Sequence, residues 1–282
     1  SALFTLGGFG SAQLIRLASN LILTRLLFPE AFGMMALTMV FLQGLQMFSD
    51  VGVAPAIQQS KRGDDADFLD TAWTIQVVRG LCLWQETGDL AWPQLQIYGE
   101  PMLLLLLPAM GLTLIVQGFN PTKMETANRH LMLGRVTLLD IATQVIGIVT
   151  AVALAFWLRS VWALVVSGLL SALVQLWLNT AFLPGRRNHL RWEKPAAQEL
   201  IHFGKWIFLS TLVGFLYHQG DKIILGRYLP IDQFGVYNIG FFLASFPMLL
   251  GLMITRKVLI PIYRETPPGA DPANFAKLRK MR

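Results

Sequence analysis

The sequence predicts an all-α membrane protein that crosses the bilayer about eight times, and three observations lead to that fold class. Hydrophobic residues make up 54% of the 282 residues and charged residues only 14%. Soluble domains carry about 25% charged residues, so this composition is typical of a polytopic membrane protein. The apolar residues are gathered in runs of about 20 or more, the length that an α-helix needs to cross a bilayer. The third observation is that a stretch near the start recurs 202 positions later.

Eight segments have the length and apolar character of membrane-spanning helices. They are expected at about 4–28, 32–58, 69–92, 101–120, 131–158, 160–183, 203–229 and 233–262. Helix-breaking residues separate some of them, such as Pro29 after the first segment and Pro184 after the sixth. No signal-peptide pattern precedes Leu3, so we expect the first segment to be a permanent span.

The third segment contains a polar run, Gln85-Glu86-Thr87-Gly88-Asp89. One interpretation is that the second half of this helix lines a wet cavity, because polar groups at membrane depth persist only where they are shielded from lipid. The other is that the helix ends early and that Trp92 and Pro93 begin a surface segment. We favour the wet cavity.

The basic residues lie mainly in the loops that follow even-numbered segments. They are Lys61, Arg62, Lys123, Arg129, Arg135, Arg186, Arg187, Arg191 and Lys194, and after the eighth segment Arg264, Lys277, Arg279, Lys280 and Arg282. Loops after odd-numbered segments contain little beyond Arg25, Arg159 and Arg227. The positive-inside rule therefore predicts that the N-terminus and the even-numbered loops are cytoplasmic.

The repeat aligns residues 21–33 with residues 223–235 without a gap. The matched pairs are Ile22 with Ile224, Leu23 with Leu225, Arg25 with Arg227, Leu27 with Leu229, Phe32 with Phe234 and Gly33 with Gly235. Chance supplies some Ile and Leu matches in an apolar chain, but an arginine and a Phe-Gly pair in constant register are more specific. One interpretation is that two membrane helices merely end alike. The other, which we favour, is an internal duplication.

A duplication divides the chain into four regions. We expect a six-helix lobe in residues 1–185, a basic cytoplasmic linker in 186–202, the first two helices of a second, truncated lobe in 203–262, and a basic cytoplasmic tail in 263–282. An even number of helix starts separates the two copies, so both cross the membrane in the same direction. Transporters whose halves are related by an axis along the membrane normal share this arrangement.

Polar residues form a stripe on the first helix and another on the seventh. The stripe residues are Gln13, Arg16, Asn20 and Thr24 in the first helix, and Thr211, Gly214, His218, Asp221 and Lys222 in the seventh. At about 100° per residue, each set falls within about 100° of arc, so each occupies one face of its helix. The two stripes superpose under the 202-residue shift, which supports the duplication.

Charged residues within the apolar segments are the candidates for function. A charge at mid-bilayer costs about 2.5–3.5 kcal/mol on insertion scales, so such residues usually face a cavity or a partner. The candidate substrate-binding residues are Arg16, Asn20, Arg25, Arg79, Asp221, Lys222 and Arg227, and the candidates for coupling transport to an ion are Asp50, Asp140 and His218. The structural alternatives are that Asp50 and Asp140 pair with an arginine or cap the backbone, that Arg25 and Arg227 reach lipid headgroups, and that His218 is a packing residue.

The charged candidates are basic on balance. Guanidinium groups pair bidentately with phosphate, so a cavity lined by these residues suits an anionic amphiphile with a diphosphate headgroup better than a cationic drug. The net charge of +6 is spread over short loops rather than one basic face, so no nucleic-acid partner is expected. The single cysteine, Cys82, allows neither an intrachain disulfide nor a structural zinc site, and we expect no metal or cofactor.

Four stretches resemble a known family of transporters. They are LTRLLFPEAFG at 23–33, FSDVG at 48–52, TAWTIQ at 71–76 and QGDKIILGR at 219–227. They are similar to motifs of bacterial oligosaccharide flippases for O-antigen and exopolysaccharide. These flippases belong to the superfamily of multidrug, oligosaccharidyl-lipid and polysaccharide exporters.

The resemblance implies two six-helix lobes around a central cavity in the bacterial inner membrane. It implies that a polyprenyl-diphosphate-linked oligosaccharide is turned from the cytoplasmic to the outer leaflet by alternating access, and that Arg16, Arg25, Lys222 and Arg227 hold the diphosphate. Membrane lipids and polysaccharide polymerase or export machinery are the other expected partners. The chain departs from the family in two ways: about four of the usual twelve helices are missing, and the polar run 85–89 replaces an apolar helix. A fragment, a truncated product and a degenerate copy are the three explanations.

Two other functions were weighed against the flippase. A polytopic glycosyltransferase or ligase acting on the same lipid carrier needs catalytic carboxylates in a sizeable loop outside the membrane. The outer loops are very short, and the Asp64-Asp65-Ala66-Asp67 cluster is typical of a solvated loop and helix start. A cation-coupled drug exporter of the same fold is disfavoured by the basic balance. We therefore expect a transporter rather than an enzyme.

Overall fold

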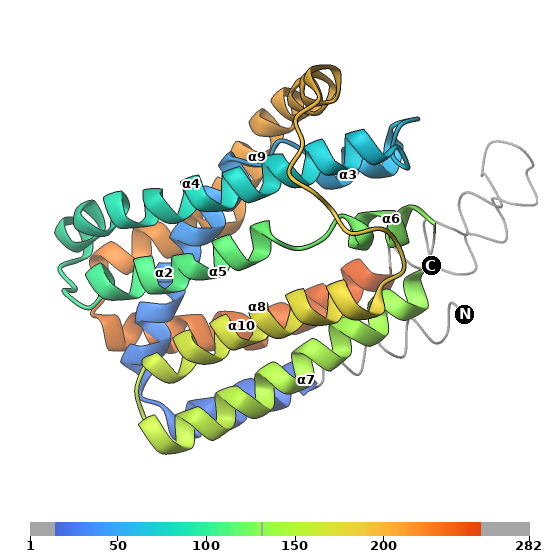
Figure 1. Cartoon of the computed structure of the whole chain (residues 1–282). Coiled ribbons are helices and arrows are strands. Elements are labelled where there is room, and N and C mark those ends of the chain that lie inside the picture. Colours follow the sequence, from blue (N-terminus) through green and yellow to red (C-terminus); the bar gives the residue numbers. More distant parts are fainter. Residues whose placement is uncertain (1–14, 131, 255–282) are drawn as a thin grey trace, which may run out of the picture. The chain divides into compact units, whose positions relative to one another are not determined.

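A computed structural model describes residues 15–130 and 132–254. These residues form helices joined by loops, and the described part of the chain contains no strand (Figure 1). Residues 15–26 are helical and are followed by α2 (Pro29–Phe48), α3 (Val53–Gln59), α4 (Ala66–Tyr98), α5 (Leu103–Gly118), α6 (Lys123–Arg129), α7 (Leu133–Leu158), α8 (Trp162–Phe182), α9 (Lys194–Tyr228) and α10 (Ile231–Ile254). The all-α fold class is confirmed.

The chain divides into two compact units, and the boundary between them in the sequence falls within α10. The first extends to Asn238, and the second begins at Ile239. The described part of the second unit is the last portion of α10, in which Ser245 Oγ donates to the carbonyl of Phe242. All of the sites discussed below lie in the first unit.

Within the first unit, helices that follow each other in sequence pack as antiparallel pairs. The α4 and α5 helices lie side by side, as do α7 and α8, and α5 also packs against α8 (Figure 1). The α2 helix contacts α4, α5 and α9. Fully buried residues of α5, among them Leu106 and Leu107, lie in the largest apolar cluster together with residues of α2, α4, α7 and α8.

The expected second helix, 32–58, is broken into α2 and α3. Gly52 has a φ of 67°, a left-handed conformation that glycine adopts without strain, and its N–H donates to the Asp50 carboxylate over 2.8 Å. Ser49 closes the end of α2 by donating to the Leu45 carbonyl over 2.6 Å. The prediction of one continuous helix was therefore wrong, because an Asx-type turn in the FSDVG motif interrupts it.

The third predicted helix is longer than expected and does not end at the polar run. The α4 helix continues through Gln85–Asp89 and Pro93 to Tyr98. Gln85, Glu86 and Asp89 are exposed, while Thr87 is buried and donates to the carbonyl of Trp84 over 2.5 Å. The alternative of an early helix end is wrong. The sequence alone did not decide the matter, because the exposed polar residues share one helix with a buried apolar face.

The α9 helix begins at Lys194, so the second half of the expected linker is helical. Its first turns bury Ala196, Ala197 and Leu200 against α3 and α4. The residues before it lie along the start of α4. There Asp70 accepts from Arg186 Nη2 over 2.9 Å and from the His189 backbone N–H over 3.1 Å.

The helix boundaries follow the register of the repeat. The starts of α2 and α10, at Pro29 and Ile231, are 202 positions apart, like the matched sequences. The two starts also pack against each other through the matched glycines. A Cβ added to Gly235 would lie 1.9 Å from the Pro29 carbonyl oxygen, and one added to Gly33 would lie 2.3 Å from the Ile231 carbonyl oxygen. Both positions therefore require glycine, which explains why the Phe-Gly pair recurs.

Three helices in the described part of the chain are long and apolar enough to cross a membrane: Pro29–Phe48, Gly134–Leu158 and Trp162–Phe182. The pair Leu103–Gly118 and Lys123–Arg129, bent by 60°, would add a fourth if it forms one broken span. The count of eight spans stays a prediction, and so does the division into lobes.

Candidate functional site

A row of polar side chains follows one face of α2. Gln43 and Gln46 are three residues apart on one face of α2, and Asp50 follows four residues later, just beyond the end of the helix at Phe48. The helices that pack around α2 contribute further polar residues opposite this row. The result is two neighbouring cavities inside an apolar bundle.

The first cavity, called the arginine pocket below, has a volume of about 380 Å³. Its polar lining consists of Gln46 from α2, Asp50 from the break that follows α2, Gln76 and Arg79 from α4, and Gln117 from α5. Leu83 and Leu114 contribute apolar walls. The pocket therefore places one guanidinium and one carboxylate among neutral amides.

Arg79 is tied to the end of α2. Its Nε donates to Ser49 Oγ over 2.8 Å and its Nη2 donates to the backbone carbonyl of Gln46. The last carbonyls of a helix lack partners within the helix, and a cation near them is also favoured by the helix dipole. Arg79 Nη1 has no hydrogen-bond partner among the described residues. Arg79 thus stabilises the break in the second helix and keeps donors available on the pocket side.

Gln76 lines the same pocket with an unsatisfied group. Its Oε1 atom is buried and has no hydrogen-bond partner among the described residues. Leaving a buried acceptor unpaired costs about 1–3 kcal/mol, so such atoms are rare in folded proteins. A bound water or ligand hydroxyl would remove that cost.

The second cavity, called the amide pocket below, has a volume of about 420 Å³ and lies among α2, α5, α7 and α8. Its polar lining consists of Gln43, Gln46, Thr113, Gln117, Thr143, Ser171 and Gln175. None of the described residues that line it is charged. Met39, Leu42 and Met110 provide apolar surface beside these amides and hydroxyls.

The two pockets meet at a pair of amides. Gln46 Nε2 donates to Gln117 Oε1 over 2.8 Å, and both residues line both pockets. This hydrogen bond crosses from α2 to α5. It is therefore the boundary between the charged and the uncharged cavity.

A chain of hydrogen bonds connects Lys222 to the amide pocket. Lys222 Nζ donates to Gln219 Oε1 over 3.0 Å, and Gln219 Nε2 donates to Gln43 Oε1 over 2.6 Å. An ammonium group only donates, so the Lys222 contact fixes the orientation of the Gln219 amide and, through it, that of Gln43. The Lys222 contact thus fixes Gln43 as the acceptor toward Gln219, which leaves the Gln43 N–H groups as donors for other partners.

The other residues predicted from the α9 stripe have separate surroundings. Asp221 accepts a 2.5 Å hydrogen bond from the Tyr237 hydroxyl. Arg227 is exposed and lines a third cavity of about 720 Å³, whose other lining residues are mostly apolar, including Phe41, Tyr98 and Phe215. The His218 ring is exposed and packs edge-on against Tyr217.

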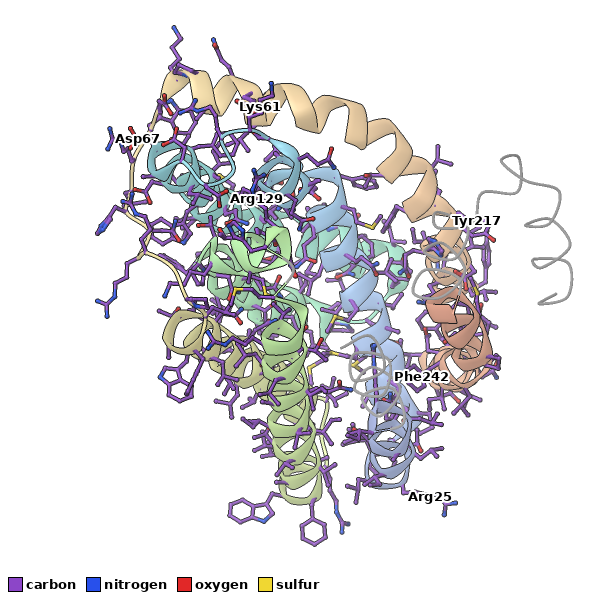
Figure 2. All side chains as sticks on the ribbon, turned by 90° about the vertical axis from the view of Figure 1, so that its right-hand side faces the viewer. Arg25, Lys61, Asp67, Arg129, Tyr217 and Phe242 are labelled. Atoms are coloured by element: carbon purple, nitrogen blue, oxygen red, sulfur yellow. The ribbon has the colours of Figure 1, made fainter. Side chains whose placement is uncertain are left out.

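The candidates on the predicted first helix and on α7, the predicted fifth helix, line none of these three cavities. Arg16 is exposed, and its carbonyl accepts from Asn20 Nδ2 over 3.2 Å. Asp140 is exposed on α7. Arg25 is exposed at the end of the helices opposite to Lys61, Asp67 and Arg129 (Figure 2). The structure therefore brings Arg79 and Asp50 into one pocket and connects Lys222 to its neighbour, but it does not gather all ten predicted residues.

Sequence reasoning missed the neutral amides. The spacing of Gln43, Gln46 and Asp50 in an otherwise apolar helix was a usable signal, because it repeats the pattern seen on the first helix. Gln117 follows the pocket residue Thr113 by four positions on α5, and Gln175 follows Ser171 by four on α8, so each helix carries only a short uncharged polar pair. They become recognisable only when α5 and α8 are packed against α2.

A separate ion-pair network surrounds the loop between α3 and α4. Arg129 Nη1 donates to the carbonyls of Ile57, Gln58 and Ser60, and its Nε donates to Asp64 over 3.1 Å. A 2.8 Å hydrogen bond with His130, together with the Arg129 charge, holds the pKa of Asp64 below its ordinary value. Hydrogen bonds from Arg62 and from the Asp67 backbone likewise lower the pKa of Asp65.

Comparison with known proteins adds a family. A family model described as "Polysaccharide biosynthesis protein" matches residues 22–267. The chain is 25% identical over 271 residues to the succinoglycan biosynthesis transport protein ExoT of Rhizobium meliloti, covering 93% of this chain and 52% of that protein. It is 22% identical over 265 residues to the lipopolysaccharide biosynthesis protein WzxC of Escherichia coli, covering 91% and 53%. The chain thus spans about half the length of these curated relatives, and no solved structure matches it.

Proposed function

We propose that this chain, which belongs to the polysaccharide biosynthesis protein family, serves as a lipid-linked oligosaccharide flippase. The substrate would be a glycan attached to a polyprenyl diphosphate, moved across the bacterial inner membrane by alternating access. One observation carries the proposal: a continuous polar tract, from Arg79 through the amide pocket to Lys222, runs inside an apolar helical bundle. Polar residues at membrane depth are costly, and in transporters they usually mark a substrate path.

The surroundings of Arg227 support an amphiphilic substrate. This residue supplies a cation to a cavity whose described lining is otherwise mostly hydrocarbon. A diphosphate attached to a prenyl chain needs both features in one place, because the phosphates seek a guanidinium and the chain seeks an apolar surface. Arg16, Arg25 and Lys222 are the further proposed contacts of the diphosphate.

Ion coupling by Asp50, Asp140 and His218 stays a prediction. Asp50 accepts a hydrogen bond from the Gly52 backbone at the start of α3, which supports the alternative that it caps the backbone. The remaining proposal concerns the second lobe. We infer that α9 and α10 are its first two helices, because their boundaries follow the repeat register, and that further helices complete it in the whole transporter.

Reconstitution tests the proposal. Proteoliposomes containing the protein should move a fluorescent polyprenyl-diphosphate disaccharide between leaflets, and Lys222→Met and Arg227→Met should each slow that movement. Lys61→Met is the matched control, since Lys61 is an exposed residue of the loop between α3 and α4 and lines none of the three cavities (Figure 2). Slowing of about ten-fold is expected for a lost charge-assisted hydrogen bond worth about 1.4 kcal/mol. Equal rates in all four proteins would contradict the flippase mechanism, and glycosyl transfer in detergent would instead favour an enzyme.

A further inference from the structure

The amide pocket differs from every other polar feature of the described chain in having many hydrogen-bonding groups and no charge. Four glutamines and three hydroxyl residues converge on it from α2, α5, α7 and α8. A phosphate in this pocket would find no described cation, and a metal ion would find no described carboxylate. The composition therefore points to a ligand that is polar and uncharged.

The hydrogen-bonding groups of the pocket are of both kinds. Gln43 has its Oε1 engaged by Gln219, which leaves its N–H groups as donors. Thr113 and Ser171 donate their own protons to the carbonyls of Met110 and Ser167, which leaves their oxygens as acceptors. A ligand with hydroxyl groups, each of which both donates and accepts, matches this mixture.

Two lining residues make no hydrogen bond within the described structure. The Gln175 amide and the Thr143 hydroxyl have no partner among the described residues. Both side chains are half-buried, so their polar groups remain accessible from the pocket and can bind a ligand without breaking an existing hydrogen bond among the described residues. Both line the amide pocket.

The size and the apolar wall fit one ring. The volume of about 420 Å³ lies within the range of about 300–1,000 Å³ that small-molecule sites occupy. Met39, Leu42 and Met110 lie beside the polar groups. A pyranose has the same division, with hydroxyls around its edge and C–H groups on its faces.

We propose that the amide pocket binds an uncharged sugar ring of the transported glycan, with Gln175 and Thr143 as residues that determine which sugar is accepted. This inference rests on the proposed function. It assigns the sugar to the amide pocket, separate from the cations that would hold the diphosphate. The Gln46–Gln117 hydrogen bond lies where the amide pocket adjoins the arginine pocket, because both residues line both pockets.

Binding measurements on the full chain in nanodiscs test the assignment. Two probes are compared: a polyprenyl diphosphate carrying a neutral disaccharide, and the same polyprenyl diphosphate without sugar. Gln175→Leu and Thr143→Val should each weaken binding of the sugar-carrying lipid by about 3- to 10-fold, the effect of one lost hydrogen bond. Binding of the sugar-free lipid should stay unchanged, because neither residue contacts the proposed diphosphate site. Neither substitution removes a hydrogen bond among the described residues, so both variants are expected to fold.

The controls are Gln233→Leu, an exposed amide outside the three cavities, and Thr150→Val, a half-buried hydroxyl on the same helix as Thr143 that also lines none of them. Both should bind the two lipids like the unaltered protein. Unchanged binding of the sugar-carrying lipid by Gln175→Leu and Thr143→Val would overturn the assignment, and so would an equal loss for both lipids.

If the protein binds neither lipid, that result refutes the proposed function but not the sugar-binding role of the amide pocket. A second measurement then tests the pocket by itself. Ser171→Cys is introduced with Cys82→Ser, so that one thiol remains, and its reaction with N-ethylmaleimide is followed. Methyl glucoside should slow the labelling at least three-fold, whereas inorganic phosphate should have no effect. A thiol that is not labelled, or that is labelled equally fast with and without methyl glucoside, would show that the pocket is closed or holds only water, and would overturn the inference.

Discussion

The contact between the two copies of the repeat predicts a large effect of a single methyl group. Replacing Gly235 by alanine would put a Cβ 1.9 Å from the Pro29 carbonyl oxygen, about 1.5 Å short of the 3.4 Å at which ordinary contact begins. The Cβ is rigidly attached to its Cα and the oxygen belongs to a backbone, so no flexible side chain can move aside. The starts of α2 and α10 must separate instead.

The energetic cost follows from what that separation disturbs. Phe234, next to the glycine, is fully buried with Leu37 and Leu103 in one apolar cluster. Overpacking in a well-packed core costs about 1–3 kcal/mol, and a clash between backbones belongs at the upper end. Alanine returns about 0.5–1 kcal/mol through its better helix propensity. The net loss of stability for Gly235→Ala is therefore about 2 kcal/mol.

Equilibrium unfolding in mixed micelles measures this loss. Gly220→Ala on α9 is the matched control, because a Cβ added there meets no atom within 4 Å. It should raise the free energy of unfolding by about 0.5 kcal/mol. Gly33→Ala should resemble Gly235→Ala, and the double variant should lose less than the sum, since both methyl groups disturb one contact. Equal stability of Gly235→Ala and Gly220→Ala would refute the close approach of the two copies.

Two further predictions concern the arginine pocket and the ion-pair network. Gln76→Leu removes an unpaired buried oxygen, so the free energy of unfolding should rise by about 1 kcal/mol. Gln117→Leu breaks the hydrogen bond with Gln46, so it should lower the free energy of unfolding. Thermal unfolding in detergent distinguishes the two signs. Asp64→Asn should destabilise the protein at neutral pH, because its folded pKa lies below the ordinary 3.8; the difference from the unaltered protein is fully present above 3.8 and disappears as the pH falls through the lowered pKa. A difference that instead grew on acidification would contradict the assigned contacts of Asp64.

Local sequence signals predicted the helices and the repeat well, because these depend on neighbouring residues. The breaks at Pro29 and Pro184, and the shared start of the two copies, follow from helix-stopping residues and from a glycine pair that only close packing explains. The break between α2 and α3 was missed because a side chain makes it. Asp50 is a plausible buried charge until its bond to the Gly52 backbone is known.

The candidate site was harder to predict, because the candidates were selected mainly by charge and the charged residues lie apart in the structure. Arg79 and Asp50 share a pocket, but Asp140 lines none of the three cavities. The amides that build the central cavities contribute no charge, and on α5 and α8 each is joined by a single hydroxyl residue four positions earlier, Thr113 or Ser171. Their association is a property of helix packing, which depends on residues far apart in sequence.

The separation of neutral and charged groups suits the proposed transport of a sugar. A site that moves its ligand must hold it in place of water and then release it. Hydrogen bonds between neutral groups contribute about 0.5–1.5 kcal/mol each, and those to charged groups about 1.5–3 kcal/mol. Several amides and hydroxyls around one ring would therefore select its pattern of hydroxyl groups through many weak contacts, each of which exchanges readily with water. The same ring held by Arg79 and Asp50 would be bound by fewer, stronger contacts and released more slowly. On this reasoning a neutral lining beyond the Gln46–Gln117 pair, which stands where the two pockets adjoin, favours rapid release as much as recognition.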